Sequence, residues 1–131
     1  MYYTVCPTGG NWTTALSQCT SAGYDGLATI TSTAENNAVF TALGALQTRV
    51  WIGFNDIATE AVWVWESGIS SSYDNWYDGS SGGSSQPSGD GDCAFMYSPT
   101  DQGNYPGTWN DRPCTSSSDS VYTYGFVCEA R

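Results

Sequence analysis

Five cysteines in a chain of 131 residues are the strongest constraint on how this sequence can fold. No two of them form a Cys-x-x-Cys pair, the spacing that many metal and redox sites use, so they indicate the disulfide framework of a secreted, extracellular protein. Four of the five can pair and one is left over. Their number alone does not say which are joined, so the pairing stays open at this point.

Side chains that offer oxygen ligands stand at both ends of the stretch 86–114, which contains Cys93 and ends at Cys114. They are Gln86, Ser88, Asp90, Asp92, Asn110 and Asp111. If Cys93 and Cys114 are bonded, the two ends of the stretch lie side by side and these oxygens converge. Oxygen ligands without nitrogen or thiolate suit a hard cation, with calcium as the natural candidate. The stretch therefore predicts a calcium site beside a disulfide.

The net charge of −10, with three arginines and no lysine, argues against binding to nucleic acid or to an anionic membrane surface. Both kinds of binding need a cationic footprint. No apolar run approaches the roughly 20 residues that a membrane-spanning helix needs, so no membrane insertion is expected. Seven of the thirteen acids lie between Glu66 and Asp111. Such crowding favours a bound cation, although a merely solvated acidic surface is the alternative.

Histidine is absent, which excludes Ser-His-Asp and Cys-His catalysis and the zinc sites that depend on imidazole. Hydrolysis by a pair of carboxylates needs no histidine, but nothing in the sequence marks two of these acids as such a pair. We therefore expect no enzyme. The N terminus carries no basic and apolar leader, and Met1 is interpreted as an initiator in front of a trimmed mature form.

Two helices are predicted in the first third of the chain. Asn11 can cap the first, which stops near Gly23 and has an apolar stripe at spacings of three and four. That stripe is Trp12, Ala15, Leu16 and Cys19. Ser32 and Glu35 have the S-x-x-E spacing of a capping box and open the second helix, which Gly44 can end. Its stripe is Ala38, Val39, Ala42 and Leu43.

Strands are predicted over ranges rich in β-forming residues, most of them in the later part of the chain. The ranges are 2–5, 50–54, 62–65, 92–97 and 122–129. Residues 66–91 show no credible regular element, and a loop of this length in a compact domain is usually functional or disordered. Burial of the strands against the two helices gives a single α+β domain over 1–131, with a long loop at about 66–92.

Seven short motifs occur in an order that identifies a known family. They are Trp12 with Ala15 and Cys19, Trp51-Ile52-Gly53-Phe54, Trp63-Val64-Trp65, Tyr73-Asp74-Asn75-Trp76, Asp92-Cys93, Trp109-Asn110-Asp111 and Phe126-Val127-Cys128-Glu129. Each motif alone is weak, but together they resemble a C-type lectin-like domain along nearly the whole chain. The resemblance implies the C-type lectin-like fold, in which two helices pack on small antiparallel sheets and a long loop binds calcium and ligand.

The resemblance also implies the disulfide pairing, with Cys19 joined to Cys128 and Cys93 joined to Cys114. On a chain-entropy estimate each bond restrains the unfolded state by roughly 3 to 5 kcal/mol, the larger value belonging to the longer loop. Cys6 has no partner in this scheme. It is therefore either a free thiol or the attachment point of a disulfide-linked partner.

In lectins of this family a Glu-Pro-Asn or Gln-Pro-Asp triplet with a cis proline, and a later Trp-Asn-Asp triplet, bind the calcium that holds the sugar. Here Pro87 matches the proline, and the resemblance implies the ligands Gln86, Ser88, Asn110 and Asp111. Two residues depart from the pattern, because Ser88 replaces a carboxylate or amide and Gly91 replaces a glutamate. A weak site is expected unless Asp90 supplies a carboxylate. In an alternative register Ser80-Ser81-Gly82 aligns with the triplet and the site is lost.

A neighbouring calcium site of the family uses an Asp-x-x-x-Glu after the Trp-Ile-Gly strand and the Asp before the cysteine. Here those residues are Asp56, Glu60 and Asp92, and all are present. Asp90 is a candidate fourth ligand. This site is better preserved than the first. In the alternative interpretation Asp56 and Glu60 only cap a turn.

Most of the tryptophans fall on core positions of the family and are predicted to pack rather than to stack on sugar. They are Trp51, Trp63, Trp65, Trp76 and Trp109. Tyr77 and Tyr105, which lie in loops beside the proposed site, are the better stacking candidates. The residues expected to contact sugar are Gln86, Ser88, Asn110, Asp111 and Tyr105.

The expected function is that of a secreted, calcium-dependent lectin that binds glycans or glycoconjugates without catalysis, with sugar hydroxyls coordinating the calcium. The Gln86-Pro87 pair leans toward galactose-type ligands, and Ser88 weakens that preference. One alternative is a protein-binding domain of the same fold that has lost sugar binding. The other is ice binding, because some fish antifreeze proteins share the fold and this chain is poor in charge and rich in Ser and Thr.

Overall fold

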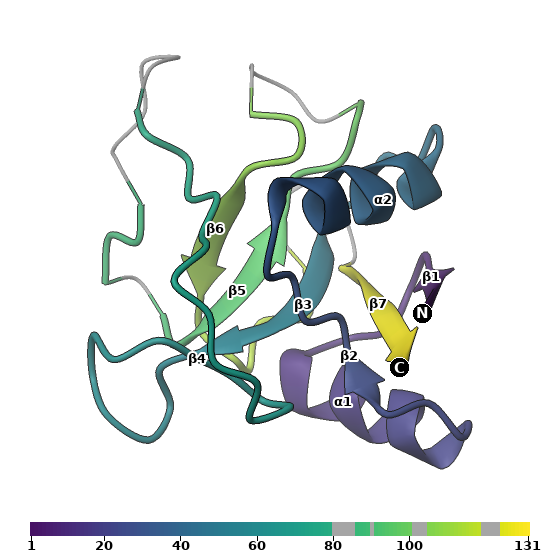
Figure 1. The fold of residues 1–131 in the computed structure, drawn as a ribbon, viewed down its shortest axis with the longest axis horizontal. Helices are drawn as coiled ribbons and strands as arrows, with labels where there is room; N and C mark the ends of the chain where they lie inside the picture. Colours follow the sequence, from purple (N-terminus) through teal and green to yellow (C-terminus); the bar gives the residue numbers. More distant parts are fainter. Residues whose placement is uncertain (80–85, 90, 101–104, 119–123) are drawn as a thin grey trace.

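The computed structural model of the protein describes residues 1–79, 86–89, 91–100, 105–118 and 124–131. Its helices and strands follow in the order β1 (Tyr2–Cys6), α1 (Trp12–Ser21), β2 (Gly26–Leu27), α2 (Thr33–Leu43), β3 (Val50–Asn55), β4 (Val64–Trp65), β5 (Cys93–Met96), β6 (Trp109–Arg112) and β7 (Gly125–Ala130). Figure 1 shows α1 and α2 on either side of the strands β1 and β7. The predicted α+β arrangement is confirmed.

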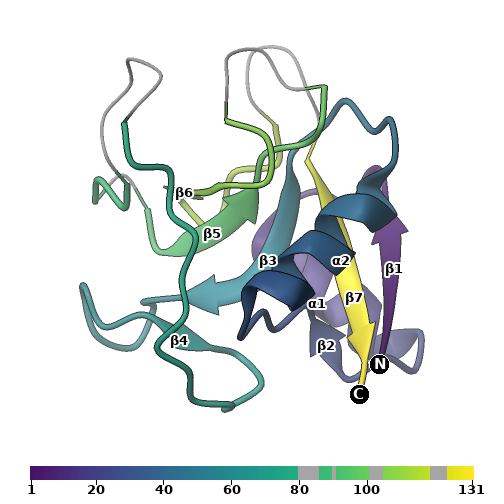
Figure 2. The ribbon, with the colours of Figure 1, turned by 45° about the horizontal axis from the view of Figure 1, so that its top comes forward.

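The strands form one mixed sheet in the order β1-β7-β3-β5-β6, with β2 beside β7 and β4 beside β3. β3 and β7 are parallel, with Val50 opposite Gly125, whereas β3 and β5 are antiparallel. The sequence analysis expected small antiparallel sheets. The structure corrects this, because the parallel pairing of β3 with β7 joins the strands into one mixed sheet. β1 pairs with β7, which places the two termini side by side (Figure 2).

Helix α1 begins where the sequence predicts. The side chain of its N-cap, Asn11, accepts a hydrogen bond from the Thr14 N–H at 2.9 Å, which satisfies one of the free donors of the first turn. The buried face consists of Trp12, Ala15 and Cys19. The Trp12 indole donates to the Ile52 carbonyl at 2.8 Å and so fastens α1 to β3.

Helix α2 begins at the predicted capping box but buries a different face. Ser32 Oγ accepts from the Glu35 N–H at 3.1 Å, and Glu35 in turn accepts from the Thr31 N–H at 2.6 Å. Ala38 and Ala42, predicted to be buried, are exposed. The buried residues are Asn36, Val39 and Leu43. Asn36 can be buried because it accepts from the Trp109 indole at 2.9 Å and donates to the Gly107 carbonyl at 3.2 Å.

Both disulfides implied by the resemblance are present. Cys19–Cys128 joins α1 to β7, and Cys93–Cys114 joins the start of β5 to the segment after β6. Cys6 is a half-buried free cysteine on β1, and burial raises the pKa of its thiol. The stretch between Cys93 and Cys114 is therefore closed by a covalent bond as well as by the β5–β6 pairing.

The observed strands differ from the predicted ranges at several places, and the two-residue strand β2 was not predicted. β4 is shorter than 62–65, and β6 was not predicted, because the Trp109-Asn110-Asp111 motif was interpreted only as a source of ligands. Residues 122 and 123 of the last predicted strand lie outside the described residues. Neither helix, in the part of the chain that is described, has the length and apolar character of a membrane span.

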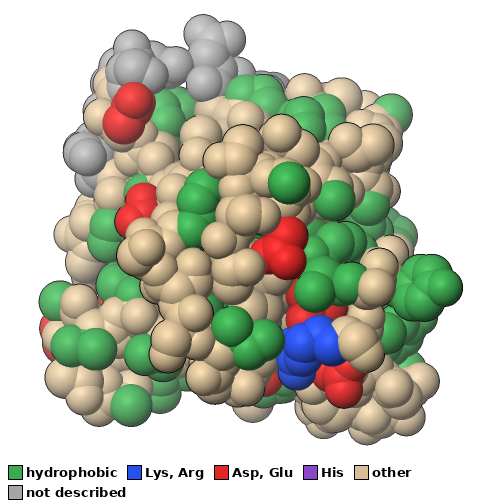
Figure 3. Space-filling model, viewed as in Figure 1, with side chains coloured by type: hydrophobic (Ala, Val, Ile, Leu, Met, Phe, Trp, Pro, Cys, Tyr) green, Lys and Arg blue, Asp and Glu red, His purple; other side chains and the backbone are tan. Residues whose placement is uncertain are grey.

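The surface seen in Figure 3 is mostly uncharged. Acidic side chains are scattered over it, and cationic ones occupy one small area near the C terminus. There Arg131 forms an ion pair with the buried Glu129, at 2.7 Å between Nη1 and Oε2.

Candidate functional site

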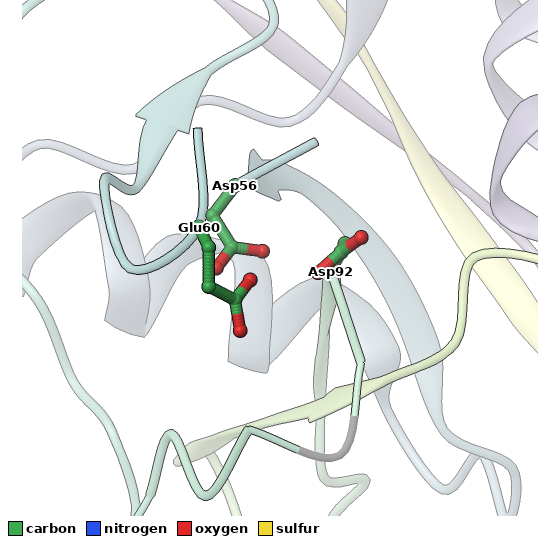
Figure 4. A group of neighbouring side chains, drawn as sticks. All are labelled: Asp56, Glu60 and Asp92. Carbon is green, nitrogen blue, oxygen red and sulfur yellow. The ribbon is translucent and has the colours of Figure 1, made fainter. Parts of the chain in front are cut away.

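Three carboxylates meet where β3 ends and β5 begins. Asp56 follows β3, Glu60 lies in the turn after it and Asp92 precedes β5, and their oxygens lie within 4.8 Å of one another (Figure 4). The strands are antiparallel with Asn55 opposite Cys93. The Asp56 N–H donates to the Asp92 carbonyl at 2.9 Å, which extends the pairing by one step. We call Asp56, Glu60 and Asp92 the acidic cluster.

Asp56 is the member of the acidic cluster that most needs a cation. It is 4% exposed, and its Oδ2 accepts from the Ala61 N–H at 2.8 Å. Its Oδ1 is buried without a hydrogen-bond partner among the described residues. A buried polar atom without a partner costs about 1 to 3 kcal/mol, and more when it is charged. A cation bound in the cluster would remove that cost.

Crowding shifts the ionisation of the other two acids. A hydrogen bond to Asp56 that only the protonated carboxyl can make, followed by electrostatic repulsion between the two charged forms, raises the pKa of Glu60. Hydrogen bonding to Asp56, followed by desolvation, raises the pKa of Asp92. A proton shared between neighbouring carboxylates relieves their repulsion. A divalent cation would do the same, and the all-oxygen donor set fits calcium.

The second half of the site is built around Asp111 on β6. The Gln86–Pro87 peptide bond is cis, as the resemblance implied. The Asp111 carboxylate is fully buried, and it accepts from the backbone N–H groups of Ser88, Gly89 and Gly91, each at 3.2 Å. We call this arrangement the Asp111 anchor. Because three N–H dipoles already face this carboxylate, it has much less need of a cation than Asp56 has.

Gly91 explains one departure from the family pattern. A Cβ placed there would lie 1.8 Å from the Arg112 carbonyl carbon and 2.1 Å from its oxygen. No side chain fits at that distance, so a glutamate cannot occupy this backbone. The same close approach brings the Gly91 N–H to Asp111.

The four predicted sugar-site ligands do not form one open set. Asn110 and Asp111 are successive on β6, so their side chains leave opposite faces of the strand. The Asn110 amide donates to the Tyr97 hydroxyl at 2.6 Å, and its Oδ1 accepts from the Asp111 N–H at 2.7 Å. The Gln86 N–H donates to the Tyr77 carbonyl at 2.8 Å. Asp90 and the alternative triplet Ser80-Ser81-Gly82 lie outside the described residues.

A hollow of about 250 Å³ connects the two halves of the site. We call it the acidic hollow, and its lining consists of Asp56, Glu60, Ala61, Trp63, Pro87, Ser88, Gly89 and Asp111. Trp63 was not among the predicted site residues, because its motif was assigned to the core. No sequence signal marked it, because 62–65 was predicted as one strand, whereas β4 begins only at Val64 and leaves Trp63 outside the sheet.

The stacking candidates are less exposed than predicted. Tyr77 is 3% exposed, so the expectation that it stacks on sugar is wrong. Its backbone N–H bonds to the Trp109 carbonyl at 3.0 Å, which draws it beneath the loop. Tyr105 is half-buried, with ring centroids 4.2 Å from Tyr77 and 4.9 Å from Tyr97. Trp51, Trp65 and Trp109 are buried as expected, whereas Trp63 and Trp76 are half-buried.

Comparisons with known proteins agree with the fold. The Lectin C-type domain model matches residues 8–130. An alpha-N-acetylgalactosamine-specific lectin of Patiria pectinifera is 30% identical over 93% of this chain and 69% of its own. The herring type II antifreeze protein is 25% identical, with a TM-score of 0.74 over 98% of this chain and 91% of that chain. Human lithostathine is 26% identical, with a TM-score of 0.74 over 96% of this chain and 88% of that chain. The chain therefore belongs to the C-type lectin domain family.

Proposed function

We propose that this chain is a calcium-dependent carbohydrate-binding protein whose calcium is held by Asp56, Glu60 and Asp92. The observation that carries the proposal is the buried, unpartnered Oδ1 of Asp56 inside a group of carboxylates within 4.8 Å of one another. When bound, calcium supplies coordination positions that sugar hydroxyls take in place of water. The chain supplies the oxygens that hold it and the walls of the acidic hollow.

The glycan occupies the acidic hollow in this proposal. Ser88 offers a hydroxyl there, and Trp63 offers an aromatic ring. Galactose-type ligands are favoured by the Gln86-Pro87 pair and by the similarity to a lectin that is specific for N-acetylgalactosamine. The disulfide framework supports secretion, with glycoconjugates as partners. No catalytic role is proposed, in line with the similarity to an N-acetylgalactosamine-specific lectin.

A second calcium on Gln86, Ser88, Asn110 and Asp111 stays a prediction, as does sugar contact by Tyr105. The geometry supports that calcium less than the first, because Asn110 is bonded to Tyr97 and the Asp111 carboxylate is supplied with backbone donors. The side chains therefore favour calcium at the acidic cluster over calcium at the second set of residues.

A glycan array tests the proposal directly. The purified protein is screened in millimolar calcium and in excess EDTA, together with the variant Asp56→Asn. A matched control is Asp74→Asn, which neutralises an exposed acid outside the acidic hollow. We expect binding in calcium for the wild type and the control, and loss of binding in EDTA and in Asp56→Asn. Binding that survives both EDTA and Asp56→Asn would overturn the proposal.

Ice binding is the second candidate function, and one surface of the molecule favours it. Helix α1 presents exposed hydroxyl side chains around a shallow hollow, and the chain is similar to the herring antifreeze protein. The lining consists of Thr13, Thr14, Ser17, Gln18 and Ser21. Thermal hysteresis of the wild type that is lost in Thr14→Lys would establish this function. An absence of hysteresis at millimolar protein would exclude it.

A further inference from the structure

Trp63 lines a second hollow in addition to the acidic hollow. This hollow has a volume of about 300 Å³ and lies at β4 and the segment that follows it. We call it the aromatic hollow, and its lining consists of Phe54, Trp63, Val64, Trp65, Gly68, Ile69, Ser70 and Ser71. Because one residue belongs to both linings, the two hollows are neighbours across Trp63.

The aromatic rings of this hollow are fixed by contact with one another. Phe54 stacks on Trp65 with ring centroids 4.4 Å apart, and its centroid lies 5.5 Å from that of Trp63. Trp63 also meets Trp76 edge to face at 4.7 Å. Rings held on both sides lose little freedom when a ligand packs against them, so the hollow is preorganised.

The aromatic hollow also contains polar groups. Ser70 and Ser71 contribute hydroxyls, of which that of Ser71 lies 3.5 Å from the Thr31 carbonyl, the limit of a hydrogen bond. Trp65, which is 3% exposed, contributes its ring to the wall. An aromatic wall with hydroxyls matches a sugar ring, which has apolar C–H faces and a rim of oxygens.

The volume limits what can enter. About 300 Å³ is the lower end of the range for small-molecule sites, which suits one sugar ring rather than a folded peptide segment. The exposed side chains Val64 and Ile69 would also accept an apolar protein side chain. Figure 3 shows a few hydrophobic side chains among uncharged polar ones over the turn between β3 and β4. Continuity with the acidic hollow favours the sugar.

We propose that the glycan site extends past Trp63 into the aromatic hollow, so that the preferred ligand is an oligosaccharide of at least two units. One unit binds at the calcium in the acidic hollow. The adjacent unit binds in the aromatic hollow without metal, with its C–H face on the tryptophan rings and its hydroxyls toward Ser70 and Ser71. This inference rests on the proposed calcium-dependent function and specifies in addition that the ligand has at least two sugar units.

Titration calorimetry with galactose and with lactose tests the extended site, in calcium and in EDTA. We expect lactose to bind roughly 5- to 10-fold more tightly than galactose in calcium, the gain expected from one ring-on-aromatic contact. In Ser70→Phe the new ring fills the hollow, so lactose should bind no more tightly than galactose, while the affinity for galactose stays unchanged. The matched control is Ser72→Phe, an exposed neighbour outside the lining, which should keep the lactose gain.

The outcomes separate this inference from the function on which it rests. Calcium-dependent galactose binding without any lactose gain would overturn the extended site and leave the proposed function standing. A lactose gain that persists in Ser70→Phe would also overturn it. Failure of both sugars to bind in calcium would overturn the galactose-type site together with its extension.

Discussion

The acidic cluster and the Asp111 anchor use the same chemical group in opposite electrostatic surroundings. Asp56 is buried with one backbone donor and two carboxylate neighbours, whereas Asp111 is buried with three backbone donors. Backbone N–H groups stabilise a buried negative charge in the way that a cation does. The two halves lie around one hollow, and only the acidic cluster needs calcium to balance its charge.

The difference follows from the path of the chain. Gly91 lies so close to β6 that it touches the Arg112 backbone, and its amide, like those of Ser88 and Gly89, donates to Asp111. The turn after β3 approaches Asp56 only with the N–H of Ala61, a non-glycine residue with a φ of 66°. Backbone that comes close enough to donate therefore takes the place of a metal, and backbone that stays away leaves room for one.

The largest effect on stability is expected from removing the Asp111 carboxylate. Asp111→Ala leaves three backbone N–H groups without an acceptor and should lower the free energy of unfolding by about 3 to 4 kcal/mol. Urea denaturation in EDTA measures it. Asp111→Asn keeps one oxygen and should lose about half as much. An effect of Asp111→Ala that exists only in calcium would show that this carboxylate binds metal after all.

The next effect is on calcium rather than on folding. Asp56→Asn removes a charge from the acidic cluster and should weaken calcium binding about 100-fold, as measured by titration calorimetry. In EDTA the same variant should be no less stable than the wild type, because the repulsion with Glu60 and Asp92 is gone. Asp74→Asn serves as the control with unchanged affinity. A loss of stability in EDTA would mean that Asp56 is a structural residue.

A third effect tests the close approach of the loop. Gly91→Ala places a methyl group against the Arg112 carbonyl and should lower the free energy of unfolding by about 2 kcal/mol, since overpacking typically costs about 1 to 3 kcal/mol. Chemical denaturation with and without calcium should give the same loss. The exposed Ser72→Ala provides a baseline near zero. If Gly91→Ala is neutral, the loop does not lie as close to β6 as described.

The smallest effect is on the pH dependence of stability, and it comes from acids that belong neither to the acidic cluster nor to the Asp111 anchor. Desolvation raises the pKa of the buried Glu129 and of Glu66. The folded state then binds more protons than the unfolded state, so in EDTA the free energy of unfolding should fall as pH rises above the ordinary pKa of a glutamate. Partial exposure of Glu66 keeps its share below about 1 kcal/mol. Glu66→Gln should flatten the pH dependence, and an unchanged profile would contradict this assignment.

Features set by local chemistry were predictable from the sequence. The caps at Asn11 and Ser32 gave both helices, and spaced motifs gave the fold, the disulfides and the three residues that meet as the acidic cluster. These signals depend on side chains within a few residues of one another or on a family pattern. They say little about which groups the backbone reaches from far along the chain.

Features set by long-range contacts were missed for that reason. Burial of Asn36 depends on Trp109, 73 positions away, so an apolar stripe could not reveal it. Tyr77 was predicted to expose its ring, because no residue close to it in the sequence indicated that its backbone N–H bonds to the Trp109 carbonyl on β6. The double role of Trp63 depends on two hollows whose other walls lie in separate segments. The Asp111 anchor likewise depends on backbone N–H groups that lie 20 or more positions from Asp111, and residue types alone do not indicate where those groups point.

Native mass spectrometry of the calcium-loaded protein counts bound ions per chain and so shows whether the acidic cluster alone binds calcium. We expect one calcium in the wild type, one in Asp111→Asn and none in Asp56→Asn. Two calcium ions in the wild type, with one lost in Asp111→Asn, would show that both halves bind metal. A calcium that persists in Asp56→Asn would contradict the assignment of the acidic cluster.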